Sequence, residues 1–176
     1  SMSQRRRIKE RVCQSIVRTL RYINPSAAKV ESPEFHYEID RRMRNLQAEK
    51  VNAVAPRGHA KSTLLAVTLV IWHIFFEPIY RELNDLFVRY DEDNDHRDYE
   101  PSYVLLISKT QKDAKKRLRE IKNVLGDVDA DKRSDTFRAL FGEWGERTAL
   151  TWREDMIILK DGTTIQAVGT GQNVHG

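Results

Sequence analysis

Hydrophobic residues recur every four positions near the start of the chain. Ile8, Val12, Ile16 and Leu20 would lie along one side of a helix, so this spacing predicts one amphipathic helix over about residues 4–22. The rest of that helix surface is mostly basic and polar. An apolar stripe of this kind is typical of a helix that packs on a core with its charged side outward.

A second helix is predicted a few residues further on. Asn24-Pro25 ends the first helix, because proline cannot donate a backbone hydrogen bond and restricts the residue before it. Ser32-Pro33 then provides a capping residue followed by proline, a common helix start, and the apolar spacing continues to about Leu46. We interpret residues 1–50 as an N-terminal helical segment.

Strand and helix patterns alternate after this segment. Residues 51–54 form a short β-branched run, residues 55–60 form a loop of small residues, and residues 61–76 predict a long buried helix that Pro78 ends. The continuous apolar run 103–107 is typical of a central parallel strand. It is followed by a helix whose inward positions are Ala114, Leu118, Ile121 and Leu125, with Gly126 at its end.

The last part of the chain has strand character. Residues 148–152, 156–159 and 163–168 each predict a strand, and Asp161-Gly162 between the last two is a strong hairpin signal. Together the patterns predict an α/β fold: a mainly parallel sheet flanked by helices, with a β-hairpin near the C-terminus. Residues 51–176 are interpreted as one core, following the helical segment 1–50.

Bulk composition excludes several classes of protein. Hydrophobic residues make up 40% and charged residues 32% of the chain, which is ordinary for a folded globular protein. The longest apolar stretch, residues 63–76, is shorter than the roughly 20 residues that cross a bilayer, and no leader is recognised, so we expect no membrane segment. Ser1 before Met2 suggests an expression-tag remnant. The single cysteine, Cys13, is expected to be a packed thiol.

Positive charge is concentrated at one end of the chain. Residues 1–22 hold seven basic residues and one acidic residue, a net charge of +6, whereas the whole chain carries +4. Such an arm would suit DNA phosphate or an acidic protein surface, and it would equally suit a solvated helix face.

The loop between the first predicted strand and the long helix has features of a phosphate-binding loop. Such a loop presents backbone N–H groups to a triphosphate, ends at a helix N-terminus, and supplies a long cation and a hydroxyl for magnesium. Lys61 and Ser62 occupy the cation and hydroxyl positions, but Ala55 and Ala60 stand at both glycine positions of the common pattern. The alternative is an ordinary strand-to-helix turn capped by Ser62 or Thr63.

The chain resembles the terminase large subunits of tailed bacteriophages, the ATPases that package viral DNA. The resemblance rests first on the run Ala55-Pro56-Arg57-Gly58-His59-Ala60-Lys61-Ser62-Thr63, which is similar to the variant Walker A motif of that family, with an arginine four residues before the lysine. Three other stretches fit in the same order: residues 35–39, residues 104–114, and the glycine-rich residues 169–176. It covers roughly residues 33–176 and implies a P-loop NTPase-type fold.

The resemblance implies roles for named residues. Lys61 would contact the β and γ phosphates of ATP, Ser62 would help to hold Mg²⁺, and Arg57 would steady the transferred charge, so Arg57 and Lys61 are the candidate catalytic residues. His36 and Tyr37 lie where the family places residues near adenine, although such side chains are more often packing residues. The cofactor-binding set is completed by Gly58, His59, Ala60 and Thr63.

The resemblance also implies partners and a location. The intact protein would translocate double-stranded DNA as a homo-oligomeric motor, with the small terminase subunit and the portal protein as partners, in the host cytoplasm. His175 stands where the family's glycine-rich motif usually shows arginine. An isolated chain of this length is compatible with a monomer.

A second set of carboxylates is missing from the pattern. Hydrolysis requires an aspartate at a strand end for magnesium and an acid that orients water, and no apolar run of this chain ends in Asp-Asp or Asp-Glu. We therefore expect a truncated ATPase core, without the nuclease domain, that binds ATP weakly and hydrolyses it negligibly. Two alternatives remain: a fragment of another P-loop nucleic-acid ATPase such as a helicase, or a non-enzymatic module that binds DNA or a partner through its basic helix.

Overall fold

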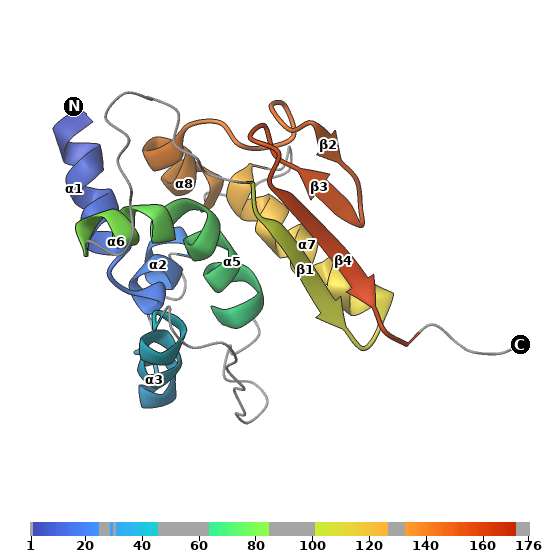
Figure 1. The fold of residues 1–176 in the computed structure, drawn as a ribbon, viewed down its shortest axis with the longest axis horizontal. Coiled ribbons are helices and arrows are strands. Elements are labelled where there is room, and N and C mark those ends of the chain that lie inside the picture. Colours follow the sequence, from blue (N-terminus) through green and yellow to red (C-terminus); the bar gives the residue numbers. More distant parts are fainter. Residues whose placement is uncertain are drawn as a thin grey trace, which may run out of the picture.

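The structure of the chain is a computed structural model that describes residues 2–24, 29, 31–45, 64–84, 101–126 and 133–171. In the described residues, most helices gather at one side of the molecule and a small sheet lies at the other, with one helix, labelled α7, packed against the sheet (Figure 1). The helices are α1 (Met2–Val12), α2 (Ile16–Ile23), α3 (Glu34–Met43), η2 (Leu64–Thr68), α5 (Leu69–Ile71), η3 (Trp72–Phe76), α6 (Glu77–Leu83), α7 (Gln111–Leu125) and α8 (Arg133–Phe141). The strands are β1 (Tyr103–Ser108), β2 (Thr151–Trp152), β3 (Met156–Ile158) and β4 (Thr164–Gly169). The predicted α/β class is confirmed.

The sequence predicted one basic helix over residues 4–22. This prediction is wrong about the number of helices, because two helices, α1 and α2, occupy this region. Ser15 interrupts them with an extended backbone, and its hydroxyl accepts a hydrogen bond from the backbone N–H of Arg18, capping α2. The buried carboxylate of Asp40 in α3 then accepts bonds from the Ser15 hydroxyl, at 3.0 Å, and from the backbone N–H of Ile16, at 2.6 Å. The break is therefore stabilised by a residue that lies on another helix.

The long central helix extends beyond its predicted end. It runs without interruption from Leu64 to Leu83, through Pro78. Two wide π-helical turns, η2 and η3, lie within it, and Pro78 falls in the first turn of the α-helical piece that follows η3. Inside a continuous helix proline removes one backbone hydrogen bond and its ring crowds the preceding turn, and the wide turn of η3 directly before Pro78 provides room for that ring. This is why Pro78 does not end the helix.

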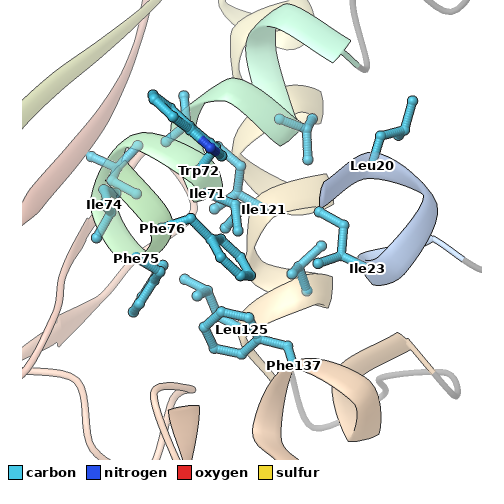
Figure 2. Packing of buried hydrophobic residues seen from close by; sticks show 14 of the residues in the cluster. Leu20, Ile23, Ile71, Trp72, Ile74, Phe75, Phe76, Ile121, Leu125 and Phe137 are labelled. Carbon is cyan, nitrogen blue, oxygen red and sulfur yellow. The ribbon is translucent and has the colours of Figure 1, made fainter. Parts of the chain in front are cut away.

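This helix is the one in the described part of the chain that is long and apolar enough to cross a membrane. Within its most apolar window, 56% is buried inside the protein, which is the behaviour of a core helix. Phe76, one of its fully buried side chains, points toward Leu125 of α7 and Phe137 of α8 (Figure 2). The described residues show no clear transmembrane span.

The N-terminal helices are attached to the same core. The indole Nε1 of Trp72 donates a 2.9 Å hydrogen bond to the carbonyl oxygen of Cys13, where α1 ends. Cys13 itself is fully buried, as expected for a packed thiol, and burial raises the pKa of that thiol to about 11. It therefore stays protonated at neutral pH.

The sheet is mixed in the described residues, with the strand order β1-β4-β3-β2. Only β1 and β4 pair in parallel, while β4 with β3 and β3 with β2 pair antiparallel. The prediction of a mainly parallel sheet is therefore wrong for this part of the chain, because its last three strands follow one another through short turns. The predicted hairpin is confirmed: Gly162, at φ 88°, turns the chain between β3 and β4.

One face of the sheet is covered and the other is open in the described residues. Helix α7 packs on β1 and β4, and it buries Leu106, Ile165 and Ala167. On the opposite face Tyr103, Leu105 and Ile107 are exposed by 63%, 50% and 62%. The run 103–107, expected to be a central strand, is thus an outer strand among the strands described.

A buried carboxylate joins the central helix to the start of β1. Glu77 is 5% exposed; it accepts a 2.8 Å bond from Arg81 and contacts the Nδ1 of His73. The other ring nitrogen of His73, Nε2, lies 3.4 Å from the hydroxyl oxygen of Ser102. Burial raises the pKa of Glu77, but the bonds and charges of His73 and Arg81 outweigh it, so the pKa lies below its usual value.

Replacing this carboxylate should remove a pH-dependent contribution to stability. A lowered pKa in the folded state means that ionised Glu77 stabilises the protein above the unfolded pKa, and that this stability is lost as pH falls through the folded pKa. Glu77→Gln should therefore lower the free energy of unfolding by about 1–2 kcal/mol at neutral pH, and by less in acid. Urea denaturation at several pH values below 7 measures this, with the exposed Glu154→Gln as a control that changes stability less. A difference that does not shrink in acid would contradict the assignment.

Candidate functional site

The predicted phosphate loop falls outside the described residues. This applies to Arg57, Gly58, His59, Ala60, Lys61, Ser62 and Thr63. The first described residue after them is Leu64, which is fully buried at the start of the long helix. In Figure 1 this helix begins in the lower half of the view, at about the level of the arrowheads of β1 and β4.

The carboxyl ends of β1 and β4 form a joined edge. Because the two strands are parallel and Ser108 pairs with Gly169, the segments that follow them, 108–110 and 169–171, leave the sheet side by side. The N–H of Thr170 donates to the carbonyl of Ser108, and the N–H of Gly171 donates to the carbonyl of Lys109, both at 2.9 Å. We call these two segments the carboxyl edge. In open α/β sheets, ligands bind outside the carboxyl ends of the strands.

The amide of Gln111 ties the carboxyl edge together. Its side-chain oxygen accepts a 2.7 Å bond from the N–H of Gly169, and its side-chain nitrogen donates a 3.0 Å bond to the carbonyl of Ala167. Gln111 is the first residue of α7, so it connects the end of β4 to the start of the helix that follows β1. Sequence reasoning missed Gln111, because a glutamine at a helix start carries no local signal for a partner 58 positions away.

The two glycines of this edge are required by close approach. A Cβ on Gly169 would lie 2.2 Å from the backbone nitrogen of Gln111, and one on Gly171 would lie 2.6 Å from the carbonyl oxygen of Lys109. Real Cβ atoms do not approach backbone atoms this closely. The glycine-rich segment noted in the sequence is thus explained, up to Gly171, by packing against the turn after β1.

The edge presents a cation, hydroxyl groups and a helix start. Thr110 caps α7, accepting a 3.1 Å bond from the N–H of Asp113 and donating a 2.8 Å bond to the Asp113 carboxylate. Lys109 is exposed beside it, and no described carboxylate forms an ion pair with its ammonium group. Lysine, hydroxyls and backbone N–H groups are the groups that proteins use to bind phosphate oxygens.

The structure does not bring His36 and Tyr37 onto one surface. His36 is 3% exposed and packs with its ring edge-on to Phe35, at 4.5 Å between centroids, whereas Tyr37 is 38% exposed on α3. Burial of His36 agrees with the packing interpretation. A contact of either side chain with adenine stays a prediction.

Neither the arrangement of possible metal ligands nor comparison with known proteins identifies the site. Among the described residues, no group of three or more histidine, cysteine, aspartate or glutamate side chains is placed to hold a metal ion. No protein-family model, curated protein or solved structure matches the chain.

Proposed function

We propose that this chain is the ATP-binding portion of a DNA-packaging motor of the terminase large-subunit type, which in the intact protein couples ATP hydrolysis to translocation of double-stranded DNA. The observation that supports it most is the carboxyl edge. Lys109, Thr110 and the glycines at 169 and 171 gather there, and the long helix begins at about the level of this edge in the view of Figure 1. A phosphate loop before that helix would face this edge.

Chain length agrees with this arrangement. Lys61 precedes Leu64 by three residues, and three residues of fully extended chain span at most about 11 Å. The extended side chain of a lysine adds several ångströms to that reach. Lys61 would then bind the β and γ phosphates, with backbone N–H groups from Gly58 to Lys61 around the oxygens.

Magnesium is part of the proposal because it accompanies triphosphates in such sites. Ser62 would supply the protein hydroxyl, while Arg57 would steady charge on the transferred phosphoryl group. At the carboxyl edge, the exposed ammonium group of Lys109 would fit the phosphate end of the nucleotide. The hydroxyls of Thr110 and Thr170 donate within the edge itself, to Asp113 and to the carbonyl of Ser108.

Titration with a fluorescent ATP analogue, with and without Mg²⁺, tests the proposal. The chain should bind saturably, and Lys61→Ala should raise the Kd by at least about 30-fold, since a charged hydrogen bond to phosphate contributes roughly 2 kcal/mol. Lys112→Ala, which removes an exposed lysine from α7, is the matched control and should leave the Kd unchanged. Equal binding by the Lys61 and Lys112 variants, or no binding by the unaltered chain, would refute the nucleotide site.

A further inference from the structure

Three arginines form an exposed strip across α1 and α2. Arg7 and Arg11 are four residues apart on α1, so their side chains lie on one side of the helix, about 6 Å apart along its axis. The guanidinium Nη1 of Arg18 on α2 lies 3.5 Å from the carbonyl oxygen of Arg11. All three side chains are exposed. We call this set the basic strip.

The basic strip has no partner among the described carboxylates. Most arginines elsewhere in the described residues form ion pairs, as Arg42 does with Glu38, Arg44 with Asp40, and Arg81 with Glu77. Even Arg6, beside the strip, bonds to Glu10 and Glu82. No ion pair within the described ranges includes Arg7, Arg11 or Arg18.

Two features of this arrangement are electrostatically unfavourable for α1, although Arg11 stands in its last turn, where the helix dipole favours positive charge. Like charges four residues apart destabilise a helix. The first turn of α1 contains no acidic residue, and Arg5 stands in it, although the positive end of the helix dipole favours negative charge. A phosphate polyanion bound along the strip would offset both effects, because its negative charges attract the arginines and the positive end of the helix dipole.

The surroundings of the strip favour nucleic acid over an acidic protein. Protein interfaces have an apolar core, and none of the large exposed apolar side chains of the described residues lies on α1 or α2; they are Tyr37, Leu83, Tyr103, Leu105, Ile107 and Leu150. The apolar side chains of α1 and α2, from Val12 to Ile23, are buried in the core. The one aromatic residue of these helices, Tyr22, is partly buried against that core, so no exposed ring is present for a base to stack on.

We infer that the basic strip binds the phosphate backbone of double-stranded nucleic acid without reading its sequence. Guanidinium groups pair with phosphate oxygens in a two-pronged geometry, and three of them, two on α1 and one on α2, can follow one strand. The inference takes its partner, double-stranded DNA, from the proposed function, but it makes no use of the nucleotide site.

Fluorescence anisotropy with a labelled duplex, in the absence of nucleotide, tests this surface. The variant with Arg7→Gln, Arg11→Gln and Arg18→Gln should weaken binding at least about tenfold at low salt, and the slope of log K against log salt should fall by about 2 to 3, since each phosphate contact contributes about 0.9. The control variant removes three exposed charges from α7, at Lys112, Lys116 and Arg119, and should weaken binding much less. Thermal unfolding of both triple variants should show a folded protein, because all six side chains are exposed.

Several outcomes would overturn the inference. Equal weakening by both triple variants would mean that overall charge, not the strip, attracts DNA. Tighter binding of a single strand of the same length, or displacement of the duplex by polyglutamate at equal charge, would assign the strip to another partner. Because no nucleotide is present, these results are independent of whether Lys61 binds ATP.

Discussion

Asp40→Ala should lower the free energy of unfolding by about 3 kcal/mol, the largest loss that we expect from a single change on the N-terminal helices. The carboxylate is 3% exposed and accepts hydrogen bonds from Ile16 N–H, the Ser15 hydroxyl and the Arg44 guanidinium. Its removal would leave the start of α2 without an acceptor and the positive charge of Arg44 without its partner. Urea denaturation of the full chain measures the change.

A neighbouring carboxylate on the same helix serves as the control. Glu38 also pairs with an arginine four residues away, Arg42, but both side chains are more than half exposed. Glu38→Ala should therefore cost less than about 0.5 kcal/mol. Asp40→Asn, which keeps an oxygen acceptor and loses the charge, should fall between the two. If Asp40→Ala were as mild as Glu38→Ala, the buried contact between α3 and α2 would not stabilise the fold.

Gly169→Ala should also be strongly destabilising, by about 3 kcal/mol, and should disrupt the carboxyl edge. The added Cβ would meet three backbone atoms of Thr110 and Gln111 at 2.2 to 2.7 Å, which no side-chain rotation can relieve. The chain would have to separate β4 from the start of α7, which breaks the bonds between Gln111 and the end of β4. Thermal and urea unfolding measure the loss of stability.

Gly142→Ala distinguishes this effect from the general cost of replacing a glycine. Gly142 has a φ of 77°, and a Cβ there would meet nothing within 4 Å, so only backbone strain opposes the change. That strain costs roughly 1 kcal/mol. In a protein with the described carboxyl edge, Gly169→Ala is the more damaging of the two, and the reverse order would show that β4 does not approach α7 as described.

Much of the architecture could be predicted from short stretches of sequence. The spacing of Ala114, Leu118, Ile121 and Leu125 identified α7, and all four side chains are buried in the structure. Asp161-Gly162 identified the hairpin, because a short turn with glycine at positive φ depends on few residues; here the loop between Leu159 and Thr163 has three residues. Alternation of strand and helix likewise identified the α/β class.

Less of the candidate site could be predicted in this way. The motif around Lys61 can be recognised from the sequence. Its residues lie outside the described part of the chain, so its role stays a proposal. The carboxyl edge was visible only as two separate segments, a polar turn after one strand and a glycine-rich run after another. Their contact depends on the parallel pairing of β1 with β4, whose partners are 61 positions apart, as in the pair of Ser108 with Gly169.

The sequence by itself determined several of the helices and strands, α7 and the hairpin of β3 and β4 among them, since those choices depend on periodicity, caps and turns within a few residues. It gave no signal for α8. Only the tertiary structure decided that Ser15 splits the basic helix, because the acceptor that favours the split, Asp40, lies 24 positions beyond Ile16. The tertiary structure also decided that the central helix continues through Pro78. It decided as well that the side chains of Tyr103, Leu105 and Ile107 are exposed. In each case the deciding interaction joins residues that local patterns do not relate, and its free energy arises only once the elements pack together.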